Sequence, residues 1–169
     1  FDEYFRVRDT CLHSHFDYKY ILFVGTALAY DEAGALEKLN KIITENQGLF
    51  SGVKLVYRPH PWRHGADTII GMNLEHVVVD PQLVDIYSRK DSLQRTQPVI
   101  SYYPSLLQNA EFVIGGLTSM LIEALIFRKR FLALVYDDGK HLTSQHNAFK
   151  YYKHFEGLDT IEAISLCDN

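Results

Sequence analysis

Short apolar segments that alternate with stretches of helical periodicity constrain the fold of this chain more than any other feature. The apolar runs are continuous rather than alternating, as is typical of strands buried on both faces of a sheet. Turn-forming or polar residues follow each run. The predicted strands are residues 20–25, 53–57, 77–79, 112–114 and 131–135.

Residues 31–46 carry the clearest helical pattern. Ala33, Leu36, Leu39, Ile42 and Ile43 recur at helical spacing, with acidic residues in the first turn and a glycine just beyond the end. Further helices are predicted at 105–110, 119–127 and 160–166, whereas 82–97 shows no assignable pattern. Strands that alternate with helices predict a parallel sheet built from right-handed crossovers, with helices on both faces. We therefore predict one Rossmann-like α/β domain over residues 1–169, with a lead-in at 1–18 and a tail at 137–169.

Composition narrows the class of protein and of partner. The chain has 169 residues, of which 47% are hydrophobic and 22% charged, as expected of a soluble globular domain. Its net charge of −4 disfavours nucleic acid as the main partner. No run approaches the roughly 18 apolar residues of a membrane span. Two reduced thiols, Cys11 and Cys167, are favoured over a disulfide, which is typical of a cytoplasmic protein. We therefore expect a cytoplasmic location. Peripheral association with the inner face of the membrane is a compatible alternative. The start at Phe1 predicts a fragment.

Three loops follow predicted strands and are expected to share one rim of the sheet. They are residues 25–30, 58–63 and 115–119. In open parallel sheets a ligand binds at the carboxyl ends of the strands. The loops therefore predict one site, with Gly25 and Thr26 at its edge.

The second loop has the sequence Arg-Pro-His-Pro-Trp-Arg. Two prolines stiffen the backbone around His60, and Arg58 and Arg63 flank it. An imidazole N–H and a nearby guanidinium suit a phosphate oxygen. The alternative is an ordinary proline-rich turn with solvated arginines.

The third loop has the sequence Gly-Gly-Leu-Thr-Ser and opens a predicted helix. Gly115 and Gly116 permit positive φ and a close backbone approach, while Thr118 and Ser119 add hydroxyl donors at the helix start. These features predict a phosphate contact, which is compatible with the alternative that Thr118 caps the helix. The spacing matches neither the ATPase phosphate loop nor the dinucleotide fingerprint.

Glu123 lies one helical turn beyond Ser119 and on the same face. Its carboxylate could accept hydrogen bonds from ribose hydroxyls or a base amino group, and the rival interpretation is a structural ion pair. Asp31 and Glu32 are expected to serve a helix start, and residues 137–139 a turn. The histidines lack zinc-site spacing, so no metal site is predicted.

Together, residues 57–61, 110–119 and 123–125 resemble the carboxy-terminal domain of GT-B glycosyltransferases. The likeness is greatest to bacterial surface-polysaccharide enzymes that use CMP-sialic acid, CMP-Kdo or CDP-glycerol, and it covers roughly residues 53–135. The resemblance implies that His60 is catalytic, that Thr118 and Ser119 hold the donor phosphate, and that no metal or other cofactor is needed. The chain departs from these enzymes at Arg128, where they usually have glycine.

The resemblance also implies the function of the larger protein. The domain would bind a nucleotide-sugar donor, and the sugar would pass to a glycan or lipid-linked glycan acceptor held by an amino-terminal domain that is not recognisable here. The fragment alone is expected to be inactive. A UDP-sugar 2-epimerase-like enzyme and a non-catalytic nucleotide-binding or scaffolding domain remain as alternatives.

Overall fold

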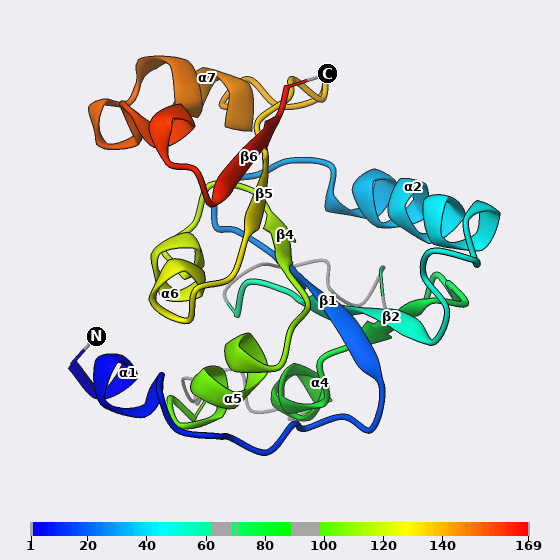
Figure 1. Ribbon diagram of the computed structural model, residues 1–169. Helices are drawn as coiled ribbons and strands as arrows, with labels where there is room; N and C mark the ends of the chain where they lie inside the picture. The colour runs from blue at the N-terminus through cyan, green and yellow to red at the C-terminus, as the bar shows by residue number, and fades with distance from the viewer. Residues whose placement is uncertain (1, 62–68, 70, 89–98, 169) are drawn as a thin grey trace.

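The strands form one parallel sheet in the computed structural model, which describes residues 2–61, 69, 71–88 and 99–168 (Figure 1). The sheet has six strands in the order β3-β2-β1-β4-β5-β6, and every neighbouring pair is parallel. This is the doubly wound order, which confirms the predicted Rossmann-like class. The strands are β1 (Lys19–Val24), β2 (Val53–Arg58), β3 (Val77–Val79), β4 (Val113–Gly115), β5 (Phe131–Leu134) and β6 (Ile164–Cys167).

Helices cover both faces of the sheet, as predicted. Helix α2 lies on one face and α5 and α6 on the other (Figure 1). The described helices are α1 (Asp2–Val7), α2 (Glu32–Glu45), α4 (Pro81–Ser88), α5 (Tyr102–Gln108), α6 (Met120–Ile126) and α7 (Gln145–Tyr151), with short 3-10 turns η1 (Lys153–Phe155) and η2 (Leu158–Thr160).

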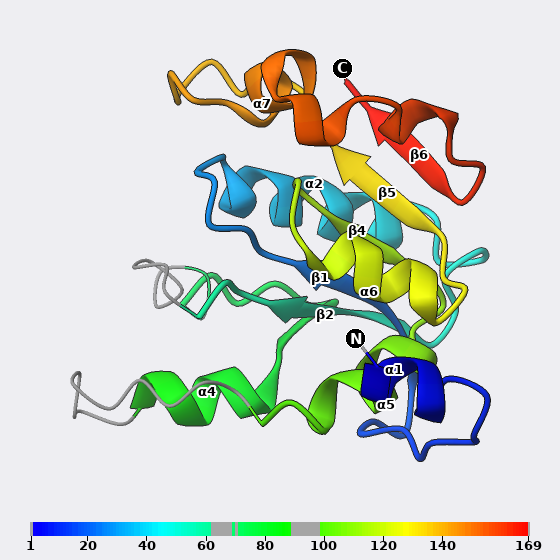
Figure 2. The same cartoon turned by 90° about the vertical axis from the view of Figure 1, so that its left-hand side faces the viewer.

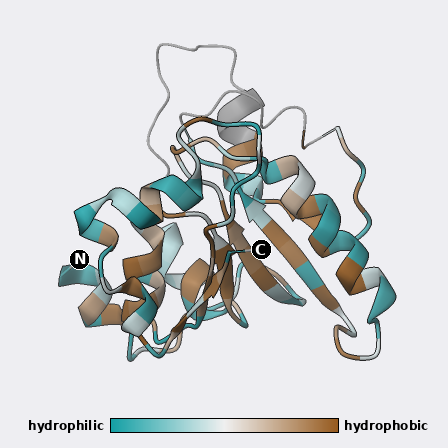
Figure 3. Ribbon diagram, turned by 90° about the horizontal axis from the view of Figure 1, so that it is seen from above, coloured by the Kyte–Doolittle hydropathy of each residue, from teal (hydrophilic) through white to brown (hydrophobic). Residues whose placement is uncertain are grey.

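Strand β1 shows how the sheet divides the core. Ile21 and Phe23 pack with Leu36 of α2, whereas Leu22 and Val24 belong to the cluster on the α5 and α6 side. Both sets are almost fully buried because side chains of a strand alternate between faces and each face here has a cover. Figure 3 shows this arrangement as apolar strands at the centre of the molecule.

The predicted closing helix at residues 160–166 is wrong. Residues Ile164–Cys167 form the edge strand β6, which pairs with β5 in the register Phe131↔Ile164 to Leu134↔Cys167. The periodicity of so short a segment is weak, and hydrogen bonds to β5 together with burial of Ile164 decide its conformation. Helices α1, α4 and α7 were also not predicted.

Two expectations from composition can be compared with the described residues. Cys11 and Cys167 are free thiols, Cys11 exposed and Cys167 partly buried. Within the described ranges no helix has both the length and the apolar character needed to cross a membrane.

Candidate functional site

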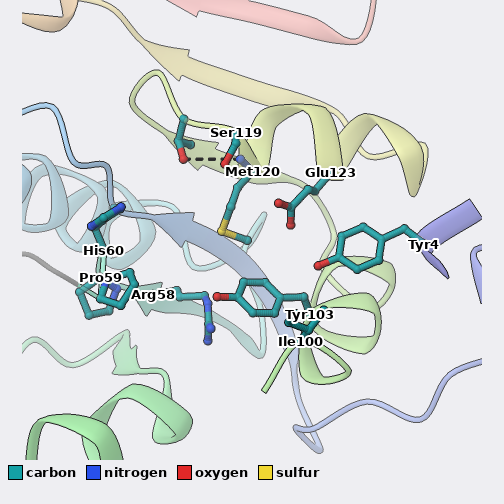
Figure 4. A pocket seen from close by; sticks show the side chains of 12 residues that line it. Tyr4, Arg58, Pro59, His60, Ile100, Tyr103, Ser119, Met120 and Glu123 are labelled. Atoms are coloured by element: carbon teal, nitrogen blue, oxygen red, sulfur yellow. Dashed lines mark hydrogen bonds between the residues drawn. The ribbon is translucent and has the colours of Figure 1, made fainter. Parts of the chain in front are cut away.

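A pocket of about 330 Å³ opens at the carboxyl ends of β1, β2 and β4 (Figure 4). The sheet order reverses at β1, where one crossover runs towards β2 and the other towards β4, and doubly wound folds bind ligands at this position. Its described lining consists of Tyr4, Gly25, Arg58, Pro59, His60, Pro61, Ile100, Tyr103, Thr118, Ser119, Met120 and Glu123. The structure therefore brings the two predicted loops together with Glu123.

His60 reaches the pocket because β1 and β2 end side by side. The Gly25 N–H donates to the Arg58 carbonyl at 2.8 Å. A Cβ at Gly25 would lie 2.7 Å from the His60 backbone nitrogen and 3.1 Å from the Cα of Pro59. The absence of a side chain at Gly25 thus allows the proline-bracketed loop to lie against the end of β1 and present His60.

Arg58 lines the pocket, but its positive charge is already neutralised by a carboxylate of the protein. Its side chain is 3% exposed, forms an ion pair with Asp80 and donates to Gln82 Oε1 at 2.9 Å. The guanidinium also stacks 4.2 Å from the ring centre of Tyr103. Burial alone would lower the pKa of Arg58, but the charge of Asp80 and the hydroxyl of Tyr103 raise it above its ordinary value.

Arg58 is therefore not the solvated arginine of an ordinary turn. It is also not an uncompensated cation available to bind a phosphate, because Asp80 already balances its charge. Asp80 follows β3, so the ion pair fastens the end of β2 to the end of β3. Arg58 therefore braces the rim on which His60 is carried. The second predicted arginine, Arg63, lies outside the described residues.

Thr118 and Ser119 line the opposite wall, at the start of α6. Ser119 is the N-cap residue, not Thr118, and its side chain makes no capping hydrogen bond. The Met120 N–H approaches Thr118 Oγ1 at 3.5 Å, the dashed line in Figure 4. The two hydroxyls thus border the pocket without a strong structural role.

Gly115, Gly116 and Thr26 are not among the residues that line the pocket. Neither glycine uses the positive φ that glycine permits, which Gly52, Gly139 and Gly157 adopt among the described glycines. A Cβ at Gly115 would meet the Val24 carbonyl oxygen at 2.4 Å, and one at Gly116 would meet Gln145 Cδ at 2.8 Å. The two glycines allow the protein to pack against itself beneath the site.

Thr26 and Gln145 connect the loops behind the pocket. The buried Thr26 hydroxyl donates to the Leu117 carbonyl at 2.8 Å. Gln145 Oε1 accepts from the Leu117 N–H at 2.7 Å, and its Nε2 donates to the Leu28 carbonyl at 3.0 Å. These bonds hold the loop after β4 against the loop after β1. Gln145 had no motif around it, and no sequence signal pointed to it.

Glu123 lines the pocket beside Tyr4 of α1 (Figure 4). The Tyr4 hydroxyl lies beside the Glu123 carboxylate, whose Oε2 atom is buried without a hydrogen-bond partner among the described residues. Burial raises the pKa of Glu123, although the neighbouring Tyr4 hydroxyl and the charge of Arg58 act to lower it. No described cation forms the structural ion pair that was the rival interpretation.

Asp31 and Glu32 have separate roles. Asp31 caps α2 as predicted, since its Oδ1 accepts from the Gly34 N–H at 3.0 Å. Glu32 is buried instead, accepting from the Tyr57 hydroxyl and from the Thr26 N–H at 3.3 Å. It therefore stabilises the loop after β1 from below.

Other predicted polar groups lie away from the pocket. Asp137 and Asp138 accept hydrogen bonds from the backbone of the turn that follows β5, and His141 Nδ1 lies 2.7 Å from Asp138 Oδ2. No group of three or more metal-ligating side chains occurs in the part of the chain that the structure describes.

Comparison with known proteins supports the fold class. No family model and no curated protein matches the sequence. The UDP-GlcNAc 2-epimerase from Methanocaldococcus jannaschii matches 99% of this chain and 39% of its own, at 13% identity and a TM-score of 0.50. The β-Kdo 2,4-transferase KpsC from Thermosulfurimonas dismutans matches 79% of this chain and 43% of its own, at 14% identity and a TM-score of 0.41.

The chain therefore spans less than half the length of either structure. At 13% identity the likeness to the epimerase concerns the fold alone. It shows that the chain has the architecture of one GT-B-like domain.

Proposed function

We propose that this chain is the donor-binding domain of a glycosyltransferase, and that its pocket holds the nucleotide part of a nucleotide-sugar. The observation that carries the proposal is that His60, Thr118 and Ser119, from two separate loops, line one pocket at the carboxyl ends of the strands. Glu123 lines the same pocket. Hydrogen-bond donors towards one end and a carboxylate at the other suit a ligand with both an anion and hydroxyl groups.

In this proposal the donor phosphate binds between the two loops. The His60 imidazole and the hydroxyls of Thr118 and Ser119 donate hydrogen bonds to its oxygens. Negative charge grows on that phosphate as the bond to the sugar breaks, and donors that are already in position stabilise it. Arg58 acts indirectly, because its ion pair with Asp80 holds the rim in place.

The remaining pocket residues fit the nucleoside. The Glu123 carboxylate accepts hydrogen bonds from ribose hydroxyls, and the side chains of Met120 and Ile100 supply apolar contact. The family resemblance favours a cytidine nucleotide. The acceptor and the catalytic base would come from another domain, so this chain binds the donor without transferring the sugar.

Calorimetric titration of the chain with CMP, CDP, UDP and GDP tests the proposal. We expect binding, with a preference for cytidine. Replacing His60 with Ala removes a hydrogen bond to a charged group and should weaken the tightest nucleotide by about 10- to 100-fold. The matched control is His154→Ala, which removes an exposed histidine outside the pocket and should leave affinity unchanged.

Three other results of these titrations would contradict part of the proposal or favour an alternative. Unchanged affinity in His60→Ala, with an unaltered melting temperature, contradicts the phosphate role of His60. A clear preference for uridine favours the epimerase-like alternative. No binding to any of the four nucleotides favours a non-catalytic domain.

A further inference from the structure

The amino-terminal helix α1 forms part of the pocket wall, although it precedes every strand of the sheet. Tyr4 is 8% exposed and lines the pocket. Its ring packs on Phe127, with the centroids 5.8 Å apart, and α1 contacts α6. Tyr4 thus reaches the helix that carries Glu123.

The segment after α1 is fastened to α5, beside which it runs in Figures 1 and 2. Gln108 donates to the carbonyls of Arg8 at 3.1 Å and Thr10 at 2.6 Å, and it accepts from the Leu12 N–H at 2.8 Å. Asn109 donates to the Leu12 carbonyl at 3.1 Å. Side chains at the carboxyl end of α5 therefore satisfy the backbone of the segment and place α1 beside the pocket.

One oxygen of the Glu123 carboxylate, Oε2, is buried with no hydrogen-bond donor among the described residues. The Tyr4 hydroxyl lies beside the carboxylate in the wall of the same pocket (Figure 4). The nearby Arg58 does not supply a hydrogen bond to Oε2, because its guanidinium is committed to Asp80 and Gln82. A buried acceptor without a donor is costly, and a ligand in the adjoining pocket can remove that cost.

We propose that Tyr4 is a positioning residue for the nucleotide. This inference rests on the proposed function. Its hydroxyl holds the Glu123 carboxylate in the orientation that presents Oε2 to the ribose hydroxyls. Since coupling between binding sites is reciprocal, nucleotide binding also strengthens the docking of α1.

Tyr4→Phe tests the proposal, because it removes the hydroxyl and keeps the ring that packs on Phe127. The probes are the tightest-binding of the four nucleotides and its 2′,3′-dideoxy form, which lacks both ribose hydroxyls. We expect Tyr4→Phe to weaken the nucleotide about five- to tenfold, less than the loss of a direct hydrogen bond to the charged phosphate because the hydroxyl acts through Glu123, and the dideoxy form less than twofold. Tyr151→Phe, in an exposed tyrosine of α7, is the matched control and should change neither affinity.

A purely structural role for Tyr4 would weaken both probes equally, and that result overturns the proposal, as does an unchanged affinity for the nucleotide. In the Glu123→Gln background the effect of Tyr4→Phe should largely disappear, because the hydroxyl acts through the carboxylate. Full additivity of the two substitutions would also overturn the proposal.

Hydrogen exchange of the α1 amides gives an independent readout. Saturating nucleotide should slow exchange in α1 of the wild-type chain and have little effect in Tyr4→Phe. Equal slowing in both proteins contradicts the coupling through Tyr4. If the wild-type chain binds none of the nucleotides, both the proposed function and this inference are contradicted. If His60→Ala and Glu123→Gln each weaken nucleotide binding but Tyr4→Phe leaves the affinity unchanged, the inference about Tyr4 is refuted and the proposed function is not.

Discussion

Gly25 allows the pocket to form because it has no side chain, which leaves room for the loop that carries His60. Its φ is not in the left-handed region, so another residue could adopt its backbone conformation. Space is the constraint, because a Cβ would meet the His60 nitrogen, the Pro59 Cα and Glu32 Oε2 at 3.1 Å or less. Two of these are backbone atoms of the rigid proline loop. Relief would therefore require the loop that carries His60 to move.

We expect Gly25→Ala to lower the free energy of unfolding by about 1–3 kcal/mol, the usual cost of overpacking, and to weaken nucleotide binding as His60 is displaced. Urea denaturation and calorimetry measure the two effects. Gly48→Ala is the matched control, because a Cβ at Gly48 meets no atom within 4 Å. It should leave binding unchanged and alter stability by less than about 1 kcal/mol. Equal behaviour of the two variants would contradict the packing argument.

Helix α6 ends in a conformation that usually calls for glycine. Arg128 has a φ of 57°. Its N–H donates to the Leu125 carbonyl and the Lys129 N–H to the Ala124 carbonyl, each at 2.9 Å. These two bonds form a Schellman motif with arginine in the left-handed position. The departure from the family pattern at this residue therefore leaves the geometry of the helix end intact. It adds strain and an exposed ion pair with Asp9 at 3.0 Å.

Comparison of Arg128→Gly with Arg128→Ala isolates that strain. Both variants lose the ion pair with Asp9, but only glycine relieves the left-handed conformation. We expect the glycine variant to be more stable than the alanine variant by about 1 kcal/mol in thermal or urea unfolding. Lower stability of the glycine variant would show that the left-handed residue costs nothing here.

The buried ion pair of Arg58 and Asp80 links segments across the molecule. Asp80 Oδ1 accepts from the Tyr102 hydroxyl at 2.9 Å and from the Gln82 N–H at 3.0 Å. The group thus ties β2 to the residue that follows β3 and to the helices α4 and α5. Both charged side chains are at most 3% exposed, so each depends on the other for compensation.

Asp80→Asn should lower the free energy of unfolding by about 3–5 kcal/mol, because it leaves the buried Arg58 charge without a partner. The double variant Arg58→Met/Asp80→Leu should lose less than the sum of its single variants, since no lone charge remains. Glu45→Gln breaks the exposed Lys41–Glu45 pair, with atoms 3.7 Å apart, and serves as the control with an expected cost below about 1 kcal/mol. Urea unfolding measures Asp80→Asn, the double variant, its two single variants and Glu45→Gln. Equal costs for Asp80→Asn and Glu45→Gln would show that burial does not strengthen the first pair.

Much of the fold followed from local sequence patterns. Apart from Lys19 at the start of β1 and Lys54 and Arg58 in β2, the residues of β1, β2 and β5 are apolar, and burial on both faces of a parallel sheet favours that composition. Strand β6 could not be predicted in this way. Its pairing with β5 is a contact between distant segments, and a short local pattern does not encode such a contact.

For the site, the sequence by itself placed His60, Thr118, Ser119 and Glu123 on loops and a helix that follow strands, because the carboxyl ends of parallel strands share one edge. Only the tertiary structure decided what each neighbouring group does. It paired Arg58 with Asp80, packed Gly115 and Gly116 against the protein itself, and brought Tyr4 to Glu123. The physical reason is that a residue's type and spacing determine whether it can be buried or can bind an anion. Its actual partner depends on which distant segments the fold brings within hydrogen-bonding distance.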